Sequence, residues 1–218
     1  MKLICIFFSF ALSASALAQL PGAMVTDHTG RTYKTVKLGT QTWMAENLRI
    51  TRFQNGDSIP QARTAEEWKK ADLAEQPAWC YYNNDTANDR TYGKLYNWWA
   101  ITDPRKLAPA KWHIPNDEEW TRVTLFLGGE RIAAQKMKLT TLWPEKGVGT
   151  NKSNFSALPS GSRDANGLFR SLGTFGIWWT AEEFSMDKSW GREMGSGNGI
   201  GRYSYQKGNG FAIRCVKD

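Results

Sequence analysis

Apolar residues recur at helical spacing in two short segments of the chain. The first segment begins at Thr64 with Glu67 three residues later, and the second begins at Asn116 with Glu119 three residues later. A polar cap followed at this distance by Glu is typical of a helix start. The apolar stripes that follow are Trp68, Ala71 and Leu73 or Ala74 in the first segment, and Trp120, Val123, Thr124 and Leu127 in the second. The pattern predicts two helices, and the glycines at 128–129 end the second.

Elsewhere the pattern predicts short strands. Residues 33–38 and 41–44 flank Gly39 and form a hairpin. Residues 177–180, with the sequence Ile-Trp-Trp-Thr, suit a buried strand. In residues 211–216 Phe, Ile and Cys alternate with Ala, Arg and Val, which predicts a final strand.

Two long stretches lack a clear period. Residues 141–154 and 184–209 are rich in Gly, Ser, Asn and Lys with single aromatic residues, which predicts long ordered loops. Asn-Gly pairs at 55–56, 166–167, 198–199 and 209–210 are candidate tight turns. Two helices, many short antiparallel strands and long loops together predict one α+β domain.

The first 18 residues have the pattern of a secretory signal peptide. Lys2 precedes an apolar run over residues 3–12, and a small-x-small site ends at Ala18. The run is shorter than the roughly 20 apolar residues that span a bilayer. We expect cleavage before Gln19, with cleavage after Ala16 as the alternative. Residues 19–218 then form a domain that is periplasmic, on the cell surface or secreted, with no transmembrane anchor.

Charge excludes one class of partner. The 218-residue chain has a formal net charge of +7, but its Lys and Arg residues are scattered between acids. A nucleic-acid platform requires a basic stripe or a basic helix. Because the sequence has neither, no nucleic-acid partner is expected.

The residues able to bind metal are few. Asn83, Asn84, Asp85, Asn88 and Asp89 form the best oxygen cluster for a structural calcium ion. Their spacing is not that of a recognised calcium loop, and such turns are common without metal. Neither His28 nor His113 lies at ligand spacing for zinc, and His113 is interpreted as a structural residue. No other cofactor is predicted.

Two cysteines follow the signal peptide, Cys80 and Cys215. In an oxidising compartment such a pair is interpreted first as a disulfide bond. Two buried free thiols are the alternative.

Spaced phrases along the chain are more specific than its composition. They include Gln41-Thr42-Trp43-Met44-Ala45-Glu46-Asn47-Leu48, Tyr92-Gly93-Lys94-Leu95-Tyr96-Asn97-Trp98, Trp112-His113-Ile114-Pro115, Phe155-Ser156-Ala157-Leu158-Pro159 and Gly210-Phe211-Ala212-Ile213-Arg214-Cys215-Val216. In this order the phrases resemble the Fibrobacter succinogenes major paralogous domain, a family of exported bacterial proteins. The chain departs from the family at Ala108, where many members have Cys.

That family is in turn similar to the C-type lectin-like fold, which formylglycine-generating enzymes share. Trp112, Pro115, Glu119 and Trp120 carry this likeness together with the closing phrase at 210–216. The resemblance implies a single C-type lectin-like domain, with its N- and C-terminal strands near each other. It also implies a disulfide bond between the region of the first helix and the last strand, which Cys80 and Cys215 would form.

The resemblance does not bring a mechanism with it. The calcium-dependent sugar site of the lectins uses Glu-Pro-Asn or Gln-Pro-Asp and a Trp-Asn-Asp phrase, and this sequence contains none of them. A disulfide bond would occupy the thiols that formylglycine chemistry requires. We therefore expect a non-enzymatic binding domain. The alternatives are a secreted hydrolase or modifying enzyme with a site assembled from distant residues, and a structural surface module.

Aromatic residues suggest where a glycan or cell-surface ligand would bind. The chain contains 11 Trp, 7 Tyr and 10 Phe, including the pairs at 98–99 and 178–179. Adjacent strand residues face opposite sides, so one member of each pair is expected at the surface. By the same reasoning Glu182 and Glu183 are solvated acids at a strand end, not a catalytic pair. The recognition face is predicted over residues 184–207, and its residues are Trp178, Trp179, Lys188, Trp190, Arg192, Tyr203 and Tyr205.

Overall fold

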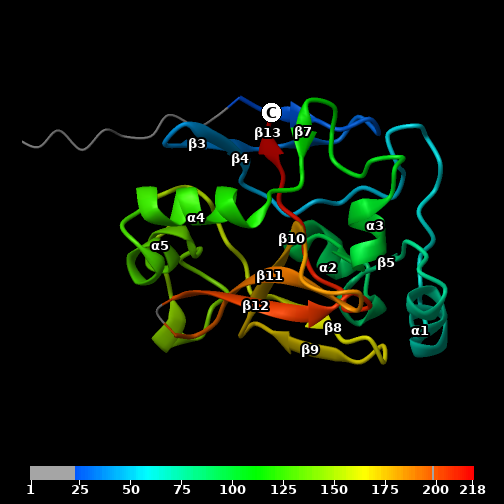
Figure 1. Cartoon of the computed structure of the whole chain (residues 1–218). Helices are drawn as coiled ribbons and strands as arrows, with labels where there is room; N and C mark the ends of the chain where they lie inside the picture. The colour runs from blue at the N-terminus through cyan, green and yellow to red at the C-terminus, as the bar shows by residue number, and fades with distance from the viewer. Residues whose placement is uncertain (1–22, 198) are drawn as a thin grey trace, which may run out of the picture.

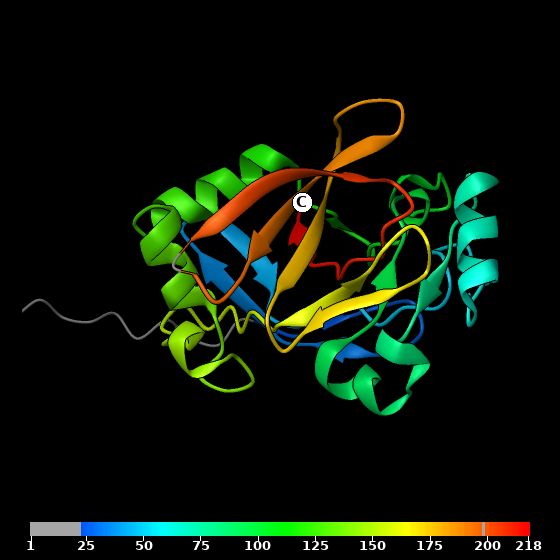
Figure 2. The ribbon, with the colours of Figure 1, turned by 90° about the horizontal axis from the view of Figure 1, so that it is seen from below.

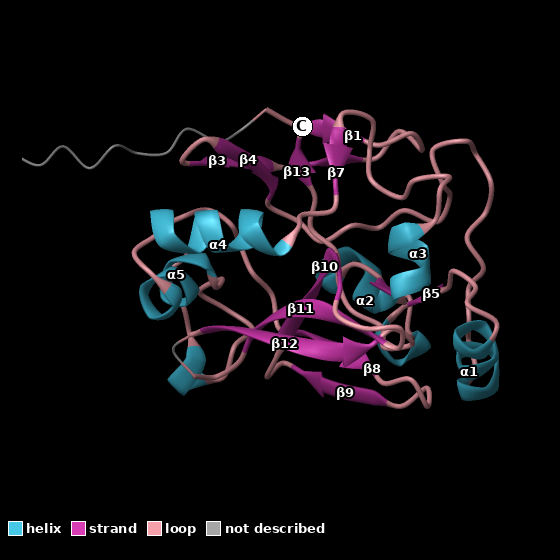
Figure 3. Ribbon diagram, in the orientation of Figure 1, coloured by secondary structure: helices cyan, strands magenta, loops and turns pink. Residues whose placement is uncertain are grey.

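The computed structural model describes residues 23–197 and 199–218, and the predicted signal peptide lies outside them. Within these residues the chain forms five α-helices and thirteen strands, so the fold is mixed α and β as predicted (Figure 1). The strands make a four-stranded sheet, a five-stranded sheet and two two-stranded sheets. In Figure 3 the helices lie around the two larger sheets, and long loops connect the elements.

The helices are α1 (Ala65–Leu73), α2 (Ala87–Tyr92), α3 (Trp98–Thr102), α4 (Asp117–Phe126) and α5 (Glu130–Met137). The strands are β1 (Val25–Thr26), β2 (Thr32–Tyr33), β3 (Thr35–Leu38), β4 (Gln41–Met44), β5 (Trp79–Cys80), β6 (Leu95–Tyr96), β7 (Trp112–His113), β8 (Ser160–Arg163), β9 (Phe169–Leu172), β10 (Gly176–Glu183), β11 (Lys188–Met194), β12 (Ile200–Gln206) and β13 (Val216–Lys217).

The four-stranded sheet, of order β3-β4-β13-β7, brings the first and last parts of the described chain together. The predicted hairpin is present, since Leu38 pairs with Gln41 and Gly39 adopts a φ of 63° in the turn. In β13 Val216 pairs with Trp43 of the hairpin. The predicted final strand is only partly correct, because β13 covers 216–217 alone. Residues 211–216 are all buried, so their alternation does not separate a core face from a solvent face.

The five-stranded sheet has the order β12-β11-β10-β8-β9. Its central strand β10 confirms the predicted buried strand at 177–180. The prediction of a long loop over 184–209 is wrong. Strands β11 and β12 form a continuous antiparallel pair there, from Lys188–Gln206 to Met194–Ile200. The Gly and Ser residues lower the local strand propensity, but pairing with β10 supplies the partner that the sequence alone does not reveal.

Both predicted helices are present with complete capping boxes. Thr64 accepts a hydrogen bond from the Glu67 backbone N at 3.1 Å, and Asn116 accepts one from the Glu119 backbone N at 2.9 Å. The number of helices was predicted wrongly, because α2, α3 and α5 are additional. The glycines at 128–129 do end α4, but Gly129 is also the N-cap of α5.

Trp120 of α4 joins the two large sheets through the core. Its ring centroid lies 4.9 Å from that of Trp43 in β4 and 6.0 Å from that of Trp178 in β10. Asn47 adds a polar link, since its Oδ1 accepts from Trp178 Nε1 at 3.0 Å and from Arg214 Nε at 2.7 Å. The segment after the β3–β4 hairpin is thereby linked both to β10 and to the C-terminal segment that contains Arg214.

Three buried cations hold irregular segments together through backbone carbonyls. Arg214 donates to the carbonyls of residues 44, 155 and 156, and Arg163 donates to those of 62, 64 and 167. Lys138 donates to the carbonyls of Gly195 and Gly197. Each cation also lies over an aromatic ring within 5 Å. Part of the net positive charge is therefore internal, and the surface is less basic than the composition indicates.

The predicted disulfide bond is not formed. Cys80 and Cys215 are both free and buried. Cys80 packs in a cluster with Trp68 and Leu95, whereas Cys215 packs in a different cluster with Met44 and other residues. Burial raises the pKa of the Cys80 thiol to about 12, and burial also raises the pKa of Cys215. The alternative of two buried thiols is the one that this structure contains.

Candidate functional site

The predicted recognition face is divided between the two sides of the β11–β12 pair. Side chains of an antiparallel pair alternate between its faces, and directly opposed residues share a face. Trp190 and Arg192 therefore share one face with Arg202, while Glu193 shares the other with Tyr203 and Tyr205. Figure 2 shows β12 and β11 at one edge of the sheet, with the tip of the β10–β11 hairpin projecting away from the body.

Trp178 and Trp179 are at 0% exposure, so neither can contact a ligand at the surface. The prediction that one of them is exposed is wrong, because β10 is covered on both sides. Trp178 packs in the core cluster of α4 and α5, and Trp179 packs with Trp98 and Phe211. Trp179 Nε1 also donates to the Tyr96 carbonyl at 2.9 Å. The other tryptophan pair, at 98–99, lies in helix α3, so strand alternation does not apply to it.

The Trp190 side of the pair is occupied by internal contacts. Arg192 is 3% exposed and donates to Asp117 Oδ1 at 2.8 Å and to Thr121 Oγ1 at 2.7 Å, which fastens β11 to the start of α4. The guanidinium of Arg202 lies 3.5 Å from the centroid of the Trp190 ring. Phe184 meets the same ring edge-to-face at 4.7 Å. Lys188 is half-buried in the hairpin, so this face offers little free stacking area.

The opposite face carries three aromatic rings that rest on glycines. A Cβ on Gly201 would lie only 2.2 Å from the ring of Tyr203. A Cβ on Gly195 would lie 2.5 Å from the ring of Phe175. A Cβ on Gly191 would likewise lie 3.0 Å from the ring of Tyr205. We call Phe175, Tyr203 and Tyr205 the aromatic platform. Tyr203 is 52% exposed and the other two rings are half-buried.

A pocket of about 310 Å³ opens beside this platform. Its lining residues are Glu130, Phe175, Glu193, Gly195, Gly197, Gly199, Ile200, Gly201 and Tyr203. Glu193 accepts a hydrogen bond from the Tyr205 hydroxyl at 2.7 Å. Burial and this carboxylate together raise the pKa of Tyr205, so its hydroxyl remains a donor. Among the described lining residues there are two carboxylates and no Lys, Arg or His.

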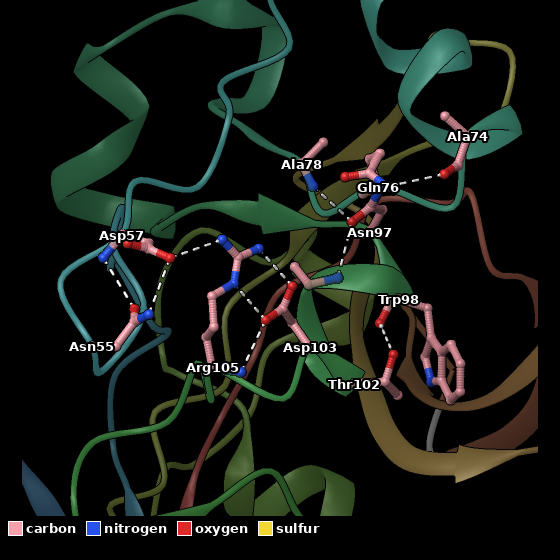
Figure 4. A network of polar contacts seen from close by, with 11 residues as sticks. Asn55, Asp57, Ala74, Gln76, Ala78, Asn97, Trp98, Thr102, Asp103 and Arg105 are labelled. Atoms are coloured by element: carbon pink, nitrogen blue, oxygen red, sulfur yellow. Dashed lines mark hydrogen bonds and ion pairs between the residues drawn. The ribbon is translucent and has the colours of Figure 1, made fainter.

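Helix α3 covers the inner end of this face. Its N-cap Asn97 accepts from the Ala100 backbone N at 3.2 Å and from the Ala78 backbone N at 2.9 Å (Figure 4). Arg105, which follows the helix, pairs with Asp103 at 2.7 Å and with Asp57 at 3.2 Å (Figure 4). Phe175 and Tyr205 pack against the cluster that contains Trp98 of α3, whereas Tyr203 is 52% exposed, so the part of the platform that remains open lies around Tyr203.

His113 is the strongest candidate for acid–base chemistry. Its Nδ1 lies 2.6 Å from Asp218 Oδ1, and its Nε2 lies 2.9 Å from Glu119 Oε1. Burial alone would lower the pKa of His113, but hydrogen bonds to the two carboxylates raise it above its ordinary value. Both ring nitrogens are thus engaged by structural groups, since Glu119 also completes the capping box of α4. No hydroxyl or thiol contacts the ring in the hydrogen bonds of the described residues.

The other acidic candidates make local contacts. Glu182 and Glu183 are exposed at the end of β10, but they are not free solvated acids as predicted. Glu182 Oε2 accepts from the Asp117 backbone N at 3.0 Å, and Glu183 Oε1 pairs with the Nζ of Lys207. In the predicted calcium cluster, Asp89 pairs with Arg49 at 2.5 Å and with Lys94 at 2.6 Å, so its oxygens already face cations. No group of three or more His, Cys, Asp or Glu in the described chain is placed to hold a metal ion. Calcium at this cluster stays a prediction.

Sequence reasoning chose Tyr203 and Tyr205 but missed Phe175, Glu193 and the glycines beneath them. One signal was available. In residues 199–205 Gly-x-Gly-x-Tyr-x-Tyr places small residues and aromatic residues on one side of a strand. The signal was hidden because the segment was interpreted as a loop, for which alternation has no meaning.

Comparison with known proteins gives one match. Residues 36–217 match the family model described as the Fibrobacter succinogenes major domain. No curated protein matches the chain, and no solved structure does. Among the described helices, none has both the length and the apolar character needed to cross a membrane.

Proposed function

The chain belongs to the Fibrobacter succinogenes major domain family, and we propose that it is an exported, non-enzymatic module that binds glycans on the aromatic platform. The observation that carries the proposal is the half-exposed ring of Tyr203, held over Gly201 at the rim of a pocket with Glu193. We also propose that the fold is C-type lectin-like. The pairing of β13 with the β3–β4 hairpin and the two capped helices support that assignment.

Glycans suit the chemistry of this pocket. A sugar ring presents an apolar C–H face that packs on an aromatic ring, and its hydroxyls donate to carboxylates and accept from phenols. Tyr203 supplies the ring, and Glu193 supplies an acceptor whose position is fixed by Tyr205. The volume of about 310 Å³ lies at the small end of ligand pockets, which span roughly 300–1,000 Å³. It would hold a short terminal segment of a glycan.

The charge of the lining restricts the ligand further. Glu130 and Glu193 both line the pocket, and the described lining has no cationic side chain. Like charges across an interface disfavour binding. We therefore propose neutral glycans as the ligands, and we expect uronic acids and sulfated sugars to bind more weakly.

A glycan array tests the proposal. The wild type would be compared with Tyr203→Ala and with Trp190→Ala, which alters an aromatic residue of the same strand pair on the opposite face. We expect Tyr203→Ala to lose neutral-glycan binding and Trp190→Ala to keep it. Loss in Trp190→Ala alone would move the site to the other face. A wild type that binds no glycan would favour a structural surface module, and turnover of a polysaccharide by the purified protein would favour an enzyme.

A further inference from the structure

Lys138 is a buried lysine whose ammonium group has no acidic partner among the described residues. Lys138 directly follows the last residue of α5, and it is 2% exposed. Its Nζ donates to the carbonyl of Gly195 and, at 2.8 Å, to the carbonyl of Gly197. The same nitrogen lies 4.8 Å from the centroid of the Trp143 ring. Burial lowers the pKa of Lys138.

The backbone of Lys138 is itself held firmly. Its N donates to the Ala134 carbonyl at 3.0 Å, and its carbonyl accepts from the Asn151 N at 3.0 Å. A Cβ on Gly149 would lie 2.3 Å from the Lys138 carbonyl oxygen, so the segment after α5 packs directly against this residue. The ammonium group therefore projects from a fixed base.

The segment that Lys138 holds is rich in glycine. Glycine occupies positions 195, 197 and 199 in the connection from β11 to β12, and position 201 in β12 itself. Because glycine has wide backbone freedom, such a segment loses much conformational entropy when it becomes ordered. Burying an ammonium group is also costly unless hydrogen bonds compensate it. Both costs are offset at one place, where the Lys138 ammonium meets the two glycine carbonyls.

The same glycines line the pocket beside the aromatic platform. Gly195, Gly197 and Gly199 all belong to its wall, and Gly195 also lies under Phe175. We propose that Lys138 is a positioning residue for the ligand pocket, because it fixes this wall from behind without lining it. This inference rests on the proposed glycan site for its functional part, whereas its structural part can be tested independently.

The test compares Lys138→Met with Lys136→Met. Methionine keeps the apolar stem but removes the donor, which leaves two carbonyls without their partner. Lys136 is the matched control, because its Nζ also donates to a backbone carbonyl, that of Leu127 at 2.9 Å, but lies outside the pocket lining. The readouts are amide hydrogen exchange of residues 195–197 and 199 and affinity for the best neutral glycan of the array.

We expect Lys138→Met to speed exchange in residues 195–197 and 199 and to weaken glycan binding about tenfold, a loss of roughly 1.4 kcal/mol. Lys136→Met should leave both unchanged. Faster exchange with unchanged affinity would overturn the positioning role, and unchanged exchange would overturn the whole inference. If the wild type binds no glycan, the exchange result still decides the structural part. Lys138→Gln, whose amide can donate to one carbonyl, gives the same comparison should the Met variant not fold.

Discussion

The ring of Tyr203 occupies the space that a side chain on Gly201 would need. A Cβ on Gly201 would lie 2.2 Å from Tyr203 Cε2 and 2.9 Å from Cζ. The two residues lie on one side of β12, and the ring folds back along the strand over the glycine. The exposed ring therefore has a defined position at the surface, which a binding site requires and a freely rotating tyrosine would not provide.

Replacing Gly201 with Ala should displace this ring with little effect on the fold. The nearest atoms belong to the end of a side chain that can swing into solvent, so the loss of stability should stay below about 1 kcal/mol. Glycan affinity should nevertheless fall, because the stacking surface moves. Ser204→Ala is the control, because Ser204 pairs with Trp190 on the opposite face of β12 and lies outside the pocket lining. Equal affinities of the two variants, measured by calorimetry, would show that the Tyr203 position is irrelevant to binding.

The parts of the fold that sequence predicted correctly are those fixed by local chemistry. The capping boxes at Thr64 and Asn116 and the turn at Gly39 depend on residues within a few positions of each other. The burial of Trp178 and Trp179 depends on α3 and α4, which lie far away in the sequence. No local pattern carries that information.

The site residues predicted from the sequence were partly wrong for a related reason. An arginine in a polar segment is expected to be a surface hydrogen-bond donor. The guanidinium of Arg192 is instead held inside the structure by Asp117 and Thr121 of α4. Trp190 was predicted to be a ring free to stack on a ligand, but the guanidinium of Arg202 lies over it. Only the strand register, which residues 188–206 acquire on pairing, separates these residues from Tyr203.

Loss of the Arg214 guanidinium should destabilise the protein strongly. The side chain is 0% exposed and makes four hydrogen bonds, to Asn47 Oδ1 and to the carbonyls of residues 44, 155 and 156. Arg214→Met leaves these buried acceptors unsatisfied, at about 1–3 kcal/mol for each group that water cannot reach. We expect a total loss of about 3–5 kcal/mol in urea unfolding. Arg122→Met is the control on an exposed helix face and should change stability by less than about 0.5 kcal/mol.

His113 should stabilise the protein in acid and lose this effect in base. Its hydrogen bonds to Asp218 and Glu119 raise its pKa in the folded state, in spite of partial burial. A raised pKa contributes stability that is fully present below the unfolded value of about 6.5 and is lost as pH rises through the folded value. The wild type should therefore exceed His113→Gln in stability at pH 5 by more than it does at pH 9. Because the side chain is 42% exposed, solvent screening should keep the difference under about 1 kcal/mol. A gap that widens with pH would contradict this assignment.

Cys80 and Cys215 should react with a thiol reagent only when the protein unfolds. Both thiols are buried, and the pKa of Cys80 is raised to about 12, so the reactive thiolate is scarce in the native state. In protein expressed without residues 1–18, which contain Cys5, a chromogenic disulfide reagent should therefore label the native state slowly and should detect both remaining thiols at once in guanidinium. Reducing agent should leave the melting temperature unchanged, since no covalent link between the two core clusters is lost. Cys80→Ser is a useful companion: one thiol should then remain detectable on unfolding, and it should be Cys215 by peptide mapping. Recovery of a peptide that links the two cysteines would instead show that the protein oxidises to a form different from this structure.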